Sequence, residues 1–284
     1  MCANHLRAIA PLVRRALAED AAHKDATSRA LIPLAARATG DFLIKQDGVI
    51  AGLPVAQEVF RQVDPKVRFT ALVADGAPVE KGDVVARVEG PLRSILAGER
   101  VALNFIQRLS GTASLTAQFV REVQGTKTKI LDTRKTTPGL RHLEKYAVRM
   151  GGGTNHRMDL SDGILVKDNH IAALRGEGWS LRRIVEEAHR NANGLPVVIE
   201  VTSVAMAREA LDAGAKRLLL DNMSLADMRR CVTLAKGKAE TEASGGMTIT
   251  RVRSVAQTGV DYISVGALTH SAGAMDISLE VKAG

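Results

Sequence analysis

The sequence predicts an α/β protein in which a barrel of parallel strands and helices follows a smaller α/β domain. After residue 125, short apolar runs alternate with helical segments at intervals of about twenty to thirty residues. Such strand–helix–strand repeats imply right-handed βαβ units and a parallel sheet. No G-x-G-x-x-G motif follows the first of these runs, which weakens the dinucleotide-binding form of such a sheet. A barrel is therefore favoured over an open, doubly wound sheet.

The N-terminal part of the chain follows a different pattern. Apolar residues recur at helical spacing over residues 6–17. The runs FLIKQ and VIAG come next, and the Asp47-Gly48 pair between them favours a tight hairpin turn. We expect a short helix over residues 54–63, extended runs around KVRFTALV and DVVARVEG, and a long helix within residues 98–125. These elements indicate a separate small α/β domain.

Six mostly apolar runs are the expected strands of the barrel: KILDTRK, GILVKDN, PVVIEVTS, RLLLDNMS, AETEASGG and YISVGALTHS. AETEASGG is the weakest of them, because its apolar content is low. Helical segments separate the later runs, and each begins after a Ser or Thr that can cap its first turn: Ser180, Ser203, Ser224 and Thr248.

The composition is that of an ordinary globular protein. Of the 284 residues, 45% are apolar and 25% are charged. No run of about 18 apolar residues predicts a transmembrane helix, and charges interrupt the apolar stretch at the N-terminus, unlike a secretory signal. Cys2 and Cys231 are too few for a disulfide framework, so we expect unpaired thiols in a reducing compartment. These features favour a cytoplasmic protein.

The formal net charge of +8 suits an anionic partner, whether nucleic acid, membrane surface or phosphorylated metabolite. Single-stranded nucleic acid is disfavoured, because its recognition relies on aromatic stacking and aromatic residues make up only 3% of the chain. The basic residues also form no tail; several stand singly at the ends of apolar runs. This distribution predicts a pocket for a small anionic molecule.

Each expected strand ends in polar or glycine residues that its apolar run does not explain. In chain order these are Arg134 and Lys135, Lys167 and Asp168, Glu200, Asp221 and Asn222, Ser244 to Gly246, and Gly266. The C-terminal strand ends of an α/β barrel form one rim, and active sites are built there. A single charge at a strand end is often merely solvated, but this succession of bases and then acids indicates one site.

The mixture of bases and acids indicates an anionic substrate held together with a metal ion. Positive charge for carboxylate and phosphate groups is supplied by Arg134, Lys135, His156, Arg157 and Lys167. Glu200 and Asp221 need a cation between themselves and such a substrate. Mg²⁺ is the natural candidate, because one or two carboxylates plus phosphate oxygens hold it. The alternative is that both carboxylates pair with neighbouring Lys or Arg.

Glycine-containing turns are the expected phosphate sites. Residues 244–246 (SGG) and 264–271 (SVGALTHS) follow the last two strands, where backbone N–H groups commonly bind phosphate. The GGGTNHR segment, residues 151–157, ends a helix with three glycines and then presents His156 and Arg157 on a loop. A flexible hinge is the alternative interpretation of that segment.

Several of these segments together resemble the quinolinate phosphoribosyltransferase family, also called nicotinate-nucleotide pyrophosphorylase (carboxylating). The resemblance is carried by LNFIQRLSGTAS, DTRKTTPGLRHLEKYAVRMGGGTNHR, LVKDNHI, LLLDNMS, EASGGM and GVDYISVGALTHS, and KDATSRALIP near the N-terminus also fits. The resemblance covers nearly the whole chain. It implies an α/β N-terminal domain (residues 1–107) and an incomplete, seven-stranded α/β barrel (residues 108–271). The last strand, about residues 272–284, would return to the first domain.

The resemblance implies a glycosyltransferase (pentosyltransferase) reaction with Mg²⁺ as cofactor. Quinolinate and phosphoribosyl pyrophosphate would give nicotinate mononucleotide, pyrophosphate and CO₂ in NAD biosynthesis. The active site would be shared in a homodimer or a higher even homo-oligomer. Carried over position by position, the quinolinate carboxylates would be held by Arg134, His156, Arg157 and Lys167, with Arg100 from the partner subunit.

The same carry-over assigns the groups that bind the phosphoribosyl donor. Lys135 would lie beside the pyrophosphate and the reacting carbon, with Lys167 also near the donor, and Glu200 and Asp221 would face the ribose hydroxyls and the metal. The 5-phosphate would be bound by Ser244, Gly245, Gly246 and Gly266, with His270 nearby.

Three other functions stay open at this point. A ModD-like paralogous phosphoribosyltransferase, of the kind associated with molybdate transport genes, would use another acceptor on the same scaffold. Nicotinate as acceptor would leave part of the cationic pocket unpaired, which is costly. A nucleic-acid-binding module would show salt-dependent binding to DNA or RNA.

Overall fold

The computed structural model describes the backbone of residues 3–283 and the side chains of residues 9–282, so Cys2 lies outside the described residues. Contacts divide the chain into two units. The first consists of Met1–Leu115, Pro138–Gly152 and Ala272–Gly284, and the second of Thr116–Thr137 and Gly153–Ser271. Helix α4 (Leu92–Glu122) runs from the first unit into the second.

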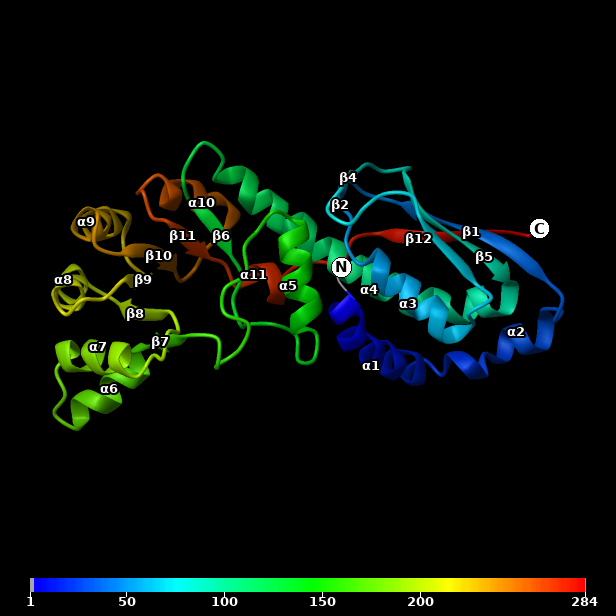
Figure 1. The fold of residues 1–284 in the computed structure, drawn as a ribbon. Coiled ribbons are helices and arrows are strands. Elements are labelled where there is room, and N and C mark those ends of the chain that lie inside the picture. Colours follow the sequence, from blue (N-terminus) through cyan, green and yellow to red (C-terminus); the bar gives the residue numbers. More distant parts are fainter. Residues whose placement is uncertain (1–2, 284) are drawn as a thin grey trace. The chain divides into compact units, whose positions relative to one another are not determined.

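The first unit is built on an antiparallel four-stranded sheet in the order β12-β1-β5-β3, and a two-stranded sheet pairs β2 with β4 (Figure 1). Its strands are β1 (Arg37–Ile44), β2 (Gly48–Val49), β3 (Arg68–Ala71), β4 (Pro78–Val79), β5 (Val84–Pro91) and β12 (Ile277–Ala283). Its helices are α1 (Ala3–Glu19), η1 (Ala22–Lys24), α2 (Ala26–Leu31), α3 (Leu53–Val63), α5 (Arg141–Met150) and the first part of α4. Because β12 pairs with β1, the end of the chain completes the N-terminal sheet.

The core of this unit explains why the predicted hairpin at Asp47-Gly48 is wrong. Phe42 in β1 is fully buried and makes edge-on ring contacts with Phe60 and Phe69. β1 is therefore a central strand, and both of its edges are already occupied by β5 and β12. The strand after the turn pairs with β4 instead, and the Asp47 carboxylate accepts a hydrogen bond of 2.9 Å from the backbone N–H of Lys81.

The second unit is built on a parallel six-stranded sheet in the order β6-β11-β10-β9-β8-β7, and helices cover its outer face (Figure 1). The strands are β6 (Lys129–Leu131), β7 (Ile164–Val166), β8 (Val197–Val201), β9 (Arg217–Asp221), β10 (Glu240–Ser244) and β11 (Tyr262–Ser264). The helices are α6 (Asp168–Gly176), α7 (Leu181–Arg190), α8 (Val204–Asp212), α9 (Leu225–Ala235), α10 (Ile249–Ala256) and α11 (Ala267–His270). All six predicted runs are strands, and the α/β fold is confirmed.

The strand count of the barrel needs one correction, because the described sheet has six strands where seven were expected. A single parallel bridge, Leu131 to Thr154, stands beside β6. Thr154 exchanges two backbone hydrogen bonds with Ile130 and Asp132, of 2.9 and 3.2 Å. The next amide that could extend the pairing, that of His156, donates to the Asp132 carboxylate at 2.9 Å. This side-chain bond ends the ladder, so the barrel stays open between β6 and β7.

The predicted helix starts are largely confirmed. The hydroxyls of Ser180, Ser203 and Ser224 each accept a hydrogen bond from the backbone N–H three residues on, at 3.1–3.2 Å. Thr248 also precedes its helix, but its side chain makes no capping bond and lies 3.1 Å from the Thr250 hydroxyl. Three of the four later helices are thus capped as the sequence indicates.

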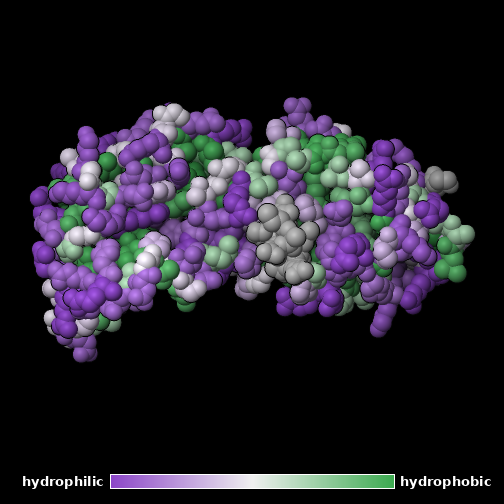
Figure 2. Space-filling view, viewed as in Figure 1, coloured by the Kyte–Doolittle hydropathy of each residue, from purple (hydrophilic) through white to green (hydrophobic). Residues whose placement is uncertain are grey.

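Searched over the described residues, the chain has no helix that is both long enough and apolar enough to cross a membrane. The visible face is mostly hydrophilic, with separate apolar areas between the polar ones (Figure 2). Cys231 carries a free thiol that is fully buried in α9. Burial, and then the charge of Asp227, raise the pKa of this thiol to about 11, so it is a poor nucleophile at neutral pH.

Candidate active site

The polar residues expected at the strand ends lie around one cavity of about 600 Å³ in the second unit. It is lined by Arg134, Lys135, His156, Arg157, Lys167, Glu200, Asp221, Ser244, Gly245, Gly246, Gly266 and His270. Most of them come from the last positions of the six parallel strands or from the loops that follow them; His156 and Arg157 lie on the loop between α5 and β7, and His270 ends α11. The structure therefore brings together residues more than a hundred positions apart, as the barrel rim predicts.

Arg100 is the remaining predicted site residue, and it lies on α4 within the first unit. Its side chain is exposed. The role expected for it belongs to a site on a second copy of the chain, and that role stays a prediction.

One part of the cavity carries positive charge from two arginines. The Nε atom of Arg134 is buried and has no hydrogen-bond partner among the described residues. Arg157 donates from Nη1 to the backbone oxygen of Gly163 at 2.8 Å, which fixes its guanidinium at the cavity. Burial, followed by the like charge of Arg134, lowers the pKa of Arg157. Two arginines held this way favour a ligand with negative charge, because a carboxylate would supply the missing acceptor.

The ring of His156 has a defined orientation beside these arginines. Its Nδ1 atom accepts the backbone N–H of Arg157 at 2.7 Å, so the ring proton is on Nε2. Nε2 lies 3.4 Å from the Glu242 carboxylate. The imidazole is therefore held between its own loop and strand β10.

Lys135 lines the cavity, and both its backbone N–H and its backbone carbonyl are hydrogen-bonded. Its N–H donates to the Thr133 hydroxyl at 3.1 Å, and its carbonyl accepts from the Thr269 hydroxyl at 2.7 Å. Gly266 makes room for its side chain, because a Cβ at that position would lie 3.1 Å from Cδ of Lys135 and 3.0 Å from Nε2 of His270. A side chain at residue 266 would therefore push both Lys135 and His270 out of place.

The same cavity also carries carboxylates. Glu200 accepts the backbone N–H of Asp168 at 3.3 Å, and Asp221 accepts from the Asn222 amide at 2.8 Å. Neither Glu200 nor Asp221 forms an ion pair with Lys or Arg in the part of the chain that the structure describes, so the ion-pair alternative is not what the fold contains. Burial raises the pKa of Glu200, and the nearby charges of Asp221 and Asp168 raise it further. A cation beside these carboxylates would relieve that repulsion.

The turn after β10 has the geometry of an anion site. Gly245 and Gly246 have positive φ angles of 89° and 55°, which glycine adopts without strain. Within the described residues, the backbone N–H groups of Gly245, Gly246 and Met247 have no hydrogen-bond partner. Free N–H groups that line a cavity bind phosphate oxygens well.

Replacing Gly245 by Ala should weaken binding of a phosphorylated ligand about tenfold or more. A Cβ there would lie 2.1 Å from Oδ1 of Asn222, so the turn would have to move, and the left-handed φ adds strain. Binding of ribose 5-phosphate can be measured by calorimetry. Gly237→Ala is the matched control, since Gly237 has a φ of 75° but nothing within 4 Å of a Cβ. Equal affinity in G245A and G237A would remove the turn from the phosphate site.

Two buried carboxylates that support the site, Glu242 and Asp132, were not found by sequence reasoning. Glu242 is fully buried, and it accepts from Arg217 at 2.7 Å, from the Ser264 hydroxyl and from the His156 ring. Asp132, also fully buried, accepts from Asn155 and from the His156 backbone. The signal for Glu242 was its position in the middle of the weakest predicted strand, AETEASGG. A carboxylate buried in a strand needs partners elsewhere in the fold.

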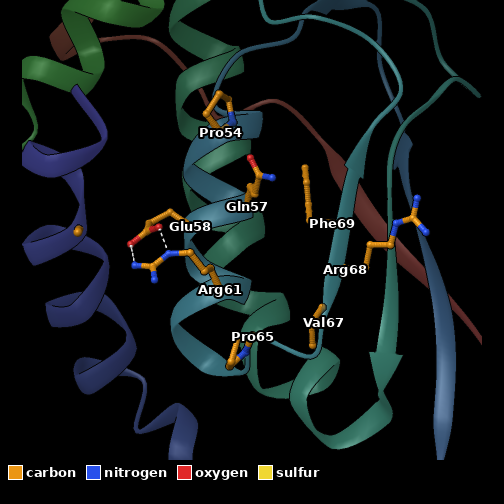
Figure 3. A pocket seen from close by; sticks show the side chains of 9 residues that line it. Pro54, Gln57, Glu58, Arg61, Pro65, Val67, Arg68 and Phe69 are labelled. Carbon is orange, nitrogen blue, oxygen red and sulfur yellow. Dashed lines mark hydrogen bonds and ion pairs between the residues drawn. The ribbon is translucent and has the colours of Figure 1, made fainter. Parts of the chain in front are cut away.

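A second cavity of about 640 Å³ lies in the first unit, beside α3 and β3 (Figure 3). Its acidic group, Glu58, already binds Arg61 through two hydrogen bonds of 2.6 and 2.7 Å. The Arg68 side chain points away from the hollow (Figure 3). The remaining lining residues are mainly apolar, so the chemical groups present, and not the volume, make the barrel cavity the candidate active site.

The fold and this cavity define an α/β-barrel enzyme that acts on small anionic molecules. Residues 25–110 match the N-terminal domain of quinolinate phosphoribosyl transferase, and residues 112–280 match the C-terminal domain. The chain therefore belongs to the quinolinate phosphoribosyltransferase family.

Relatives from plants and bacteria agree with this assignment. The mitochondrial quinolinate phosphoribosyltransferase (decarboxylating) 2b of Nicotiana tabacum is 41% identical over 95% of this chain and 81% of its own length. The NadC structure from Streptococcus pyogenes has a TM-score of 0.91 and 41% identity, covering 96% of both chains. The nicotinate-nucleotide pyrophosphorylase from Francisella tularensis has a TM-score of 0.91 and 39% identity, covering 98% of this chain and 97% of its own.

Proposed function

We propose that this protein transfers the phosphoribosyl group of phosphoribosyl pyrophosphate to quinolinate and removes one carboxylate. The products are nicotinate mononucleotide, pyrophosphate and CO₂, a step of NAD biosynthesis. The observation that carries the proposal is the cavity itself: in a chain of this family, one cavity is lined by two arginines, by two carboxylates that form no ion pair among the described residues, and by a glycine turn.

The basic part of the cavity is the proposed acceptor site. Arg134, Arg157 and Lys167 hold the two carboxylates of quinolinate, and His156 stands beside them. The unpartnered Nε of Arg134 supports this assignment, because it lacks an acceptor that a carboxylate supplies. Nicotinate, with one carboxylate, would leave part of this positive charge buried and unpaired. This part of the cavity therefore favours a dicarboxylate.

The proposed donor site combines lysines, carboxylates and glycine turns of the same cavity. Lys135, with Lys167 nearby, lies beside the pyrophosphate, while Glu200 and Asp221 face the ribose hydroxyls. The 5-phosphate binds at the turns formed by Ser244, Gly245, Gly246 and Gly266, with His270 close by. The free N–H groups of the first turn and the space that Gly266 leaves support this assignment.

The two carboxylates fit a Mg²⁺ ion. The described residues contain no cluster of three or more His, Cys, Asp or Glu that could hold a metal alone. Glu200 and Asp221 thus offer a partial set of oxygen ligands that the oxygens of the donor would complete, as is usual for Mg²⁺. When bound there, Mg²⁺ supplies positive charge against the departing pyrophosphate.

In the proposed reaction, the residues of the cavity stabilise the charges that develop, and no side chain acts as a nucleophile. Lys135 offsets the negative charge that develops on the leaving pyrophosphate, and Glu200 and Asp221 offset the positive charge left on the ribose carbon. The quinolinate nitrogen then forms the bond to that carbon and becomes cationic. It accepts the electron pair when the adjacent carboxylate leaves as CO₂, and a proton takes the place of that carboxylate.

Asp221→Asn should raise the Mg²⁺ concentration that gives half-maximal activity by roughly tenfold, because one anionic oxygen ligand is lost. Glu200→Gln should act in the same direction. The measurement is a Mg²⁺ titration of initial rate. Asp227→Asn is the control, since Asp227 lies in α9 and binds Ser224 and Arg230. An unchanged Mg²⁺ dependence in both test variants would rule out the proposed metal site.

We extend the proposal to the assembly and its location. A homodimer or a higher even homo-oligomer would let Arg100 reach the acceptor site of a second copy, which its exposed position on α4 supports. The free, buried thiol of Cys231 supports a reducing compartment such as the cytoplasm.

Pyrophosphate release tests the acceptor directly. Purified protein with phosphoribosyl pyrophosphate and Mg²⁺ should release pyrophosphate rapidly with quinolinate, and at least about a hundredfold more slowly with nicotinate. Equal rates with both acceptors would contradict the dicarboxylate site. No release with either, from folded protein that binds the donor, would mean that another acceptor is used.

A further inference from the structure

Arg251 ties together the two loops that the proposed donor site needs. It lies in the first turn of α10, outside the set of residues that line the cavity. Its Nη1 donates to the carbonyl of Gly245 at 3.2 Å, and its Nη2 donates to the carbonyl of Met223 at 3.2 Å. One side chain therefore links the loop after β10 to the loop after β9. Asp221 is the last residue of β9, so this second loop begins directly after it.

These bonds set the direction of the amides in the turn. In a trans peptide, the carbonyl of one residue and the N–H of the next point to opposite sides. The Gly245 carbonyl faces Arg251, and the Gly246 carbonyl lies 3.5 Å from the same Nη1. The N–H groups of Gly246 and Met247 therefore point away from Arg251, and these two residues line the cavity.

The turn has few other bonds to hold it in this shape. The loop after β9 contacts it through Asn222, whose backbone N–H donates to the Ser244 carbonyl at 3.0 Å. Asn222 itself has a left-handed φ of 51°, and its side chain fills the space where a Cβ on Gly245 would be. Asn222 is thus a non-glycine residue in a conformation that the surrounding contacts must hold, and a clamp between the two loops helps to keep the N–H groups aligned.

Arg251 also brings charge to the turn. Within the described residues, the hydrogen-bond partners of Arg251 are all backbone carbonyls, so its positive charge is not neutralised by a carboxylate. A full positive charge behind a set of free N–H groups increases their attraction for phosphate.

We infer that Arg251 is a positioning residue that shapes the turn of residues 244–247 for the 5-phosphate of the donor. It acts through the backbone and does not touch the substrate. This inference rests on the proposed function for the identity of the donor, but the anion site itself depends only on the geometry of the turn.

The test compares R251A and R251K with a matched variant of the same helix. Arg253, also in α10, donates from one nitrogen to the carbonyls of Glu122 and Gln124 at 3.0 and 2.7 Å, away from the cavity. R253A therefore removes an arginine–carbonyl clamp of the same kind without touching the turn. Phosphoribosyl pyrophosphate and inorganic phosphate are the probes, and their binding is measured by calorimetry in the absence of acceptor.

R251A should weaken binding of both probes about tenfold or more, because charged hydrogen bonds that fix the turn are lost. In steady state, the KM for phosphoribosyl pyrophosphate should rise by a similar factor, while kcat and the KM for quinolinate change by less than about threefold. R251K should recover part of the affinity, since a lysine donates to one loop but does not span both. R253A should bind both probes as the unaltered protein does.

Two results would overturn the inference. One is unchanged probe affinity in R251A; the other is equal loss of affinity in R251A and R253A, which would indicate a general effect on the helix. The result that would contradict the proposed function can be distinguished from these two. In that case the unaltered protein binds phosphoribosyl pyrophosphate, and R251A weakens this binding, but no nicotinate mononucleotide forms from quinolinate.

Discussion

Lys135→Ala should lower kcat/KM for phosphoribosyl transfer by a factor of about 10²–10³. The lysine is exposed, and its Cδ lies 3.1 Å from where a Cβ on Gly266 would be, at the turn where the donor is proposed to bind. Removing it takes away a charge that opposes the developing negative charge on pyrophosphate. The fold should persist, because the bonds to Thr133 and Thr269 use the backbone of Lys135.

The control for this prediction is a lysine in the same unit that lies away from the cavity. Lys238 is exposed in the turn before β10, and K238A should keep full activity. Thermal unfolding should give the same midpoint for K135A and the unaltered protein. If K135A retained more than about a third of the activity, Lys135 would have no part in stabilising the leaving group.

Glu242→Ala should destabilise the protein by about 3–5 kcal/mol, because it removes the nearer and fully buried of the two carboxylates that pair with a partly buried arginine. Arg217 donates two hydrogen bonds to Glu242 at 2.7 and 3.1 Å, and its guanidinium lies 4.0 Å from the centre of the Tyr262 ring. The His156 ring and the Ser264 hydroxyl lose a partner at the same time. Urea unfolding monitored by circular dichroism measures the loss.

The matched variant is E240A, in the same strand. Glu240 is half exposed and lies 3.8 Å from Arg217, so its removal should cost no more than about 1 kcal/mol. Similar losses in E240A and E242A would show that the buried carboxylate is not a special support of the barrel.

The charge of Glu242 also gives a pH dependence. Burial alone would raise its pKa, but the hydrogen bond from His156, the positive charge of Arg217 and the hydrogen bond from the Ser264 hydroxyl together outweigh burial and hold the pKa below its usual range. The ionised form therefore stabilises the fold above about pH 4.5, and this stability is lost as the pH falls toward the lower folded pKa. Conservative E242Q should be less stable at neutral pH, and its stability should change less between pH 5 and pH 3. A parallel decline in both proteins would contradict this account.

The strand ends were predictable from sequence because two simple signals coincide there. An apolar run predicts a buried strand, and a charged residue directly after it must lie at the rim, as Lys167 and Asp221 do. Ser180, Ser203 and Ser224 were also predictable, since the N-cap bond forms within three residues of chain. Local rules succeed where both partners are close in sequence.

Features that depend on pairing across the fold were not predictable in this way. The hairpin at Asp47-Gly48 fails because β12, from the other end of the chain, occupies the edge of β1. The seventh strand is reduced to one bridge because the Asp132 side chain takes the amide of His156. Arg251 looked like an ordinary helix residue, and only the fold places its guanidinium against the carbonyls of two loops.

The most direct test of the central claim is the fate of the quinolinate carboxylate next to the ring nitrogen. Quinolinate labelled at that carboxylate, phosphoribosyl pyrophosphate and Mg²⁺ are incubated with the purified protein, and labelled CO₂, nicotinate mononucleotide and pyrophosphate are measured together. The account predicts equal amounts of all three products, and no mononucleotide when nicotinate replaces quinolinate. Mononucleotide formed without release of the label, or formed equally well from nicotinate, would contradict it.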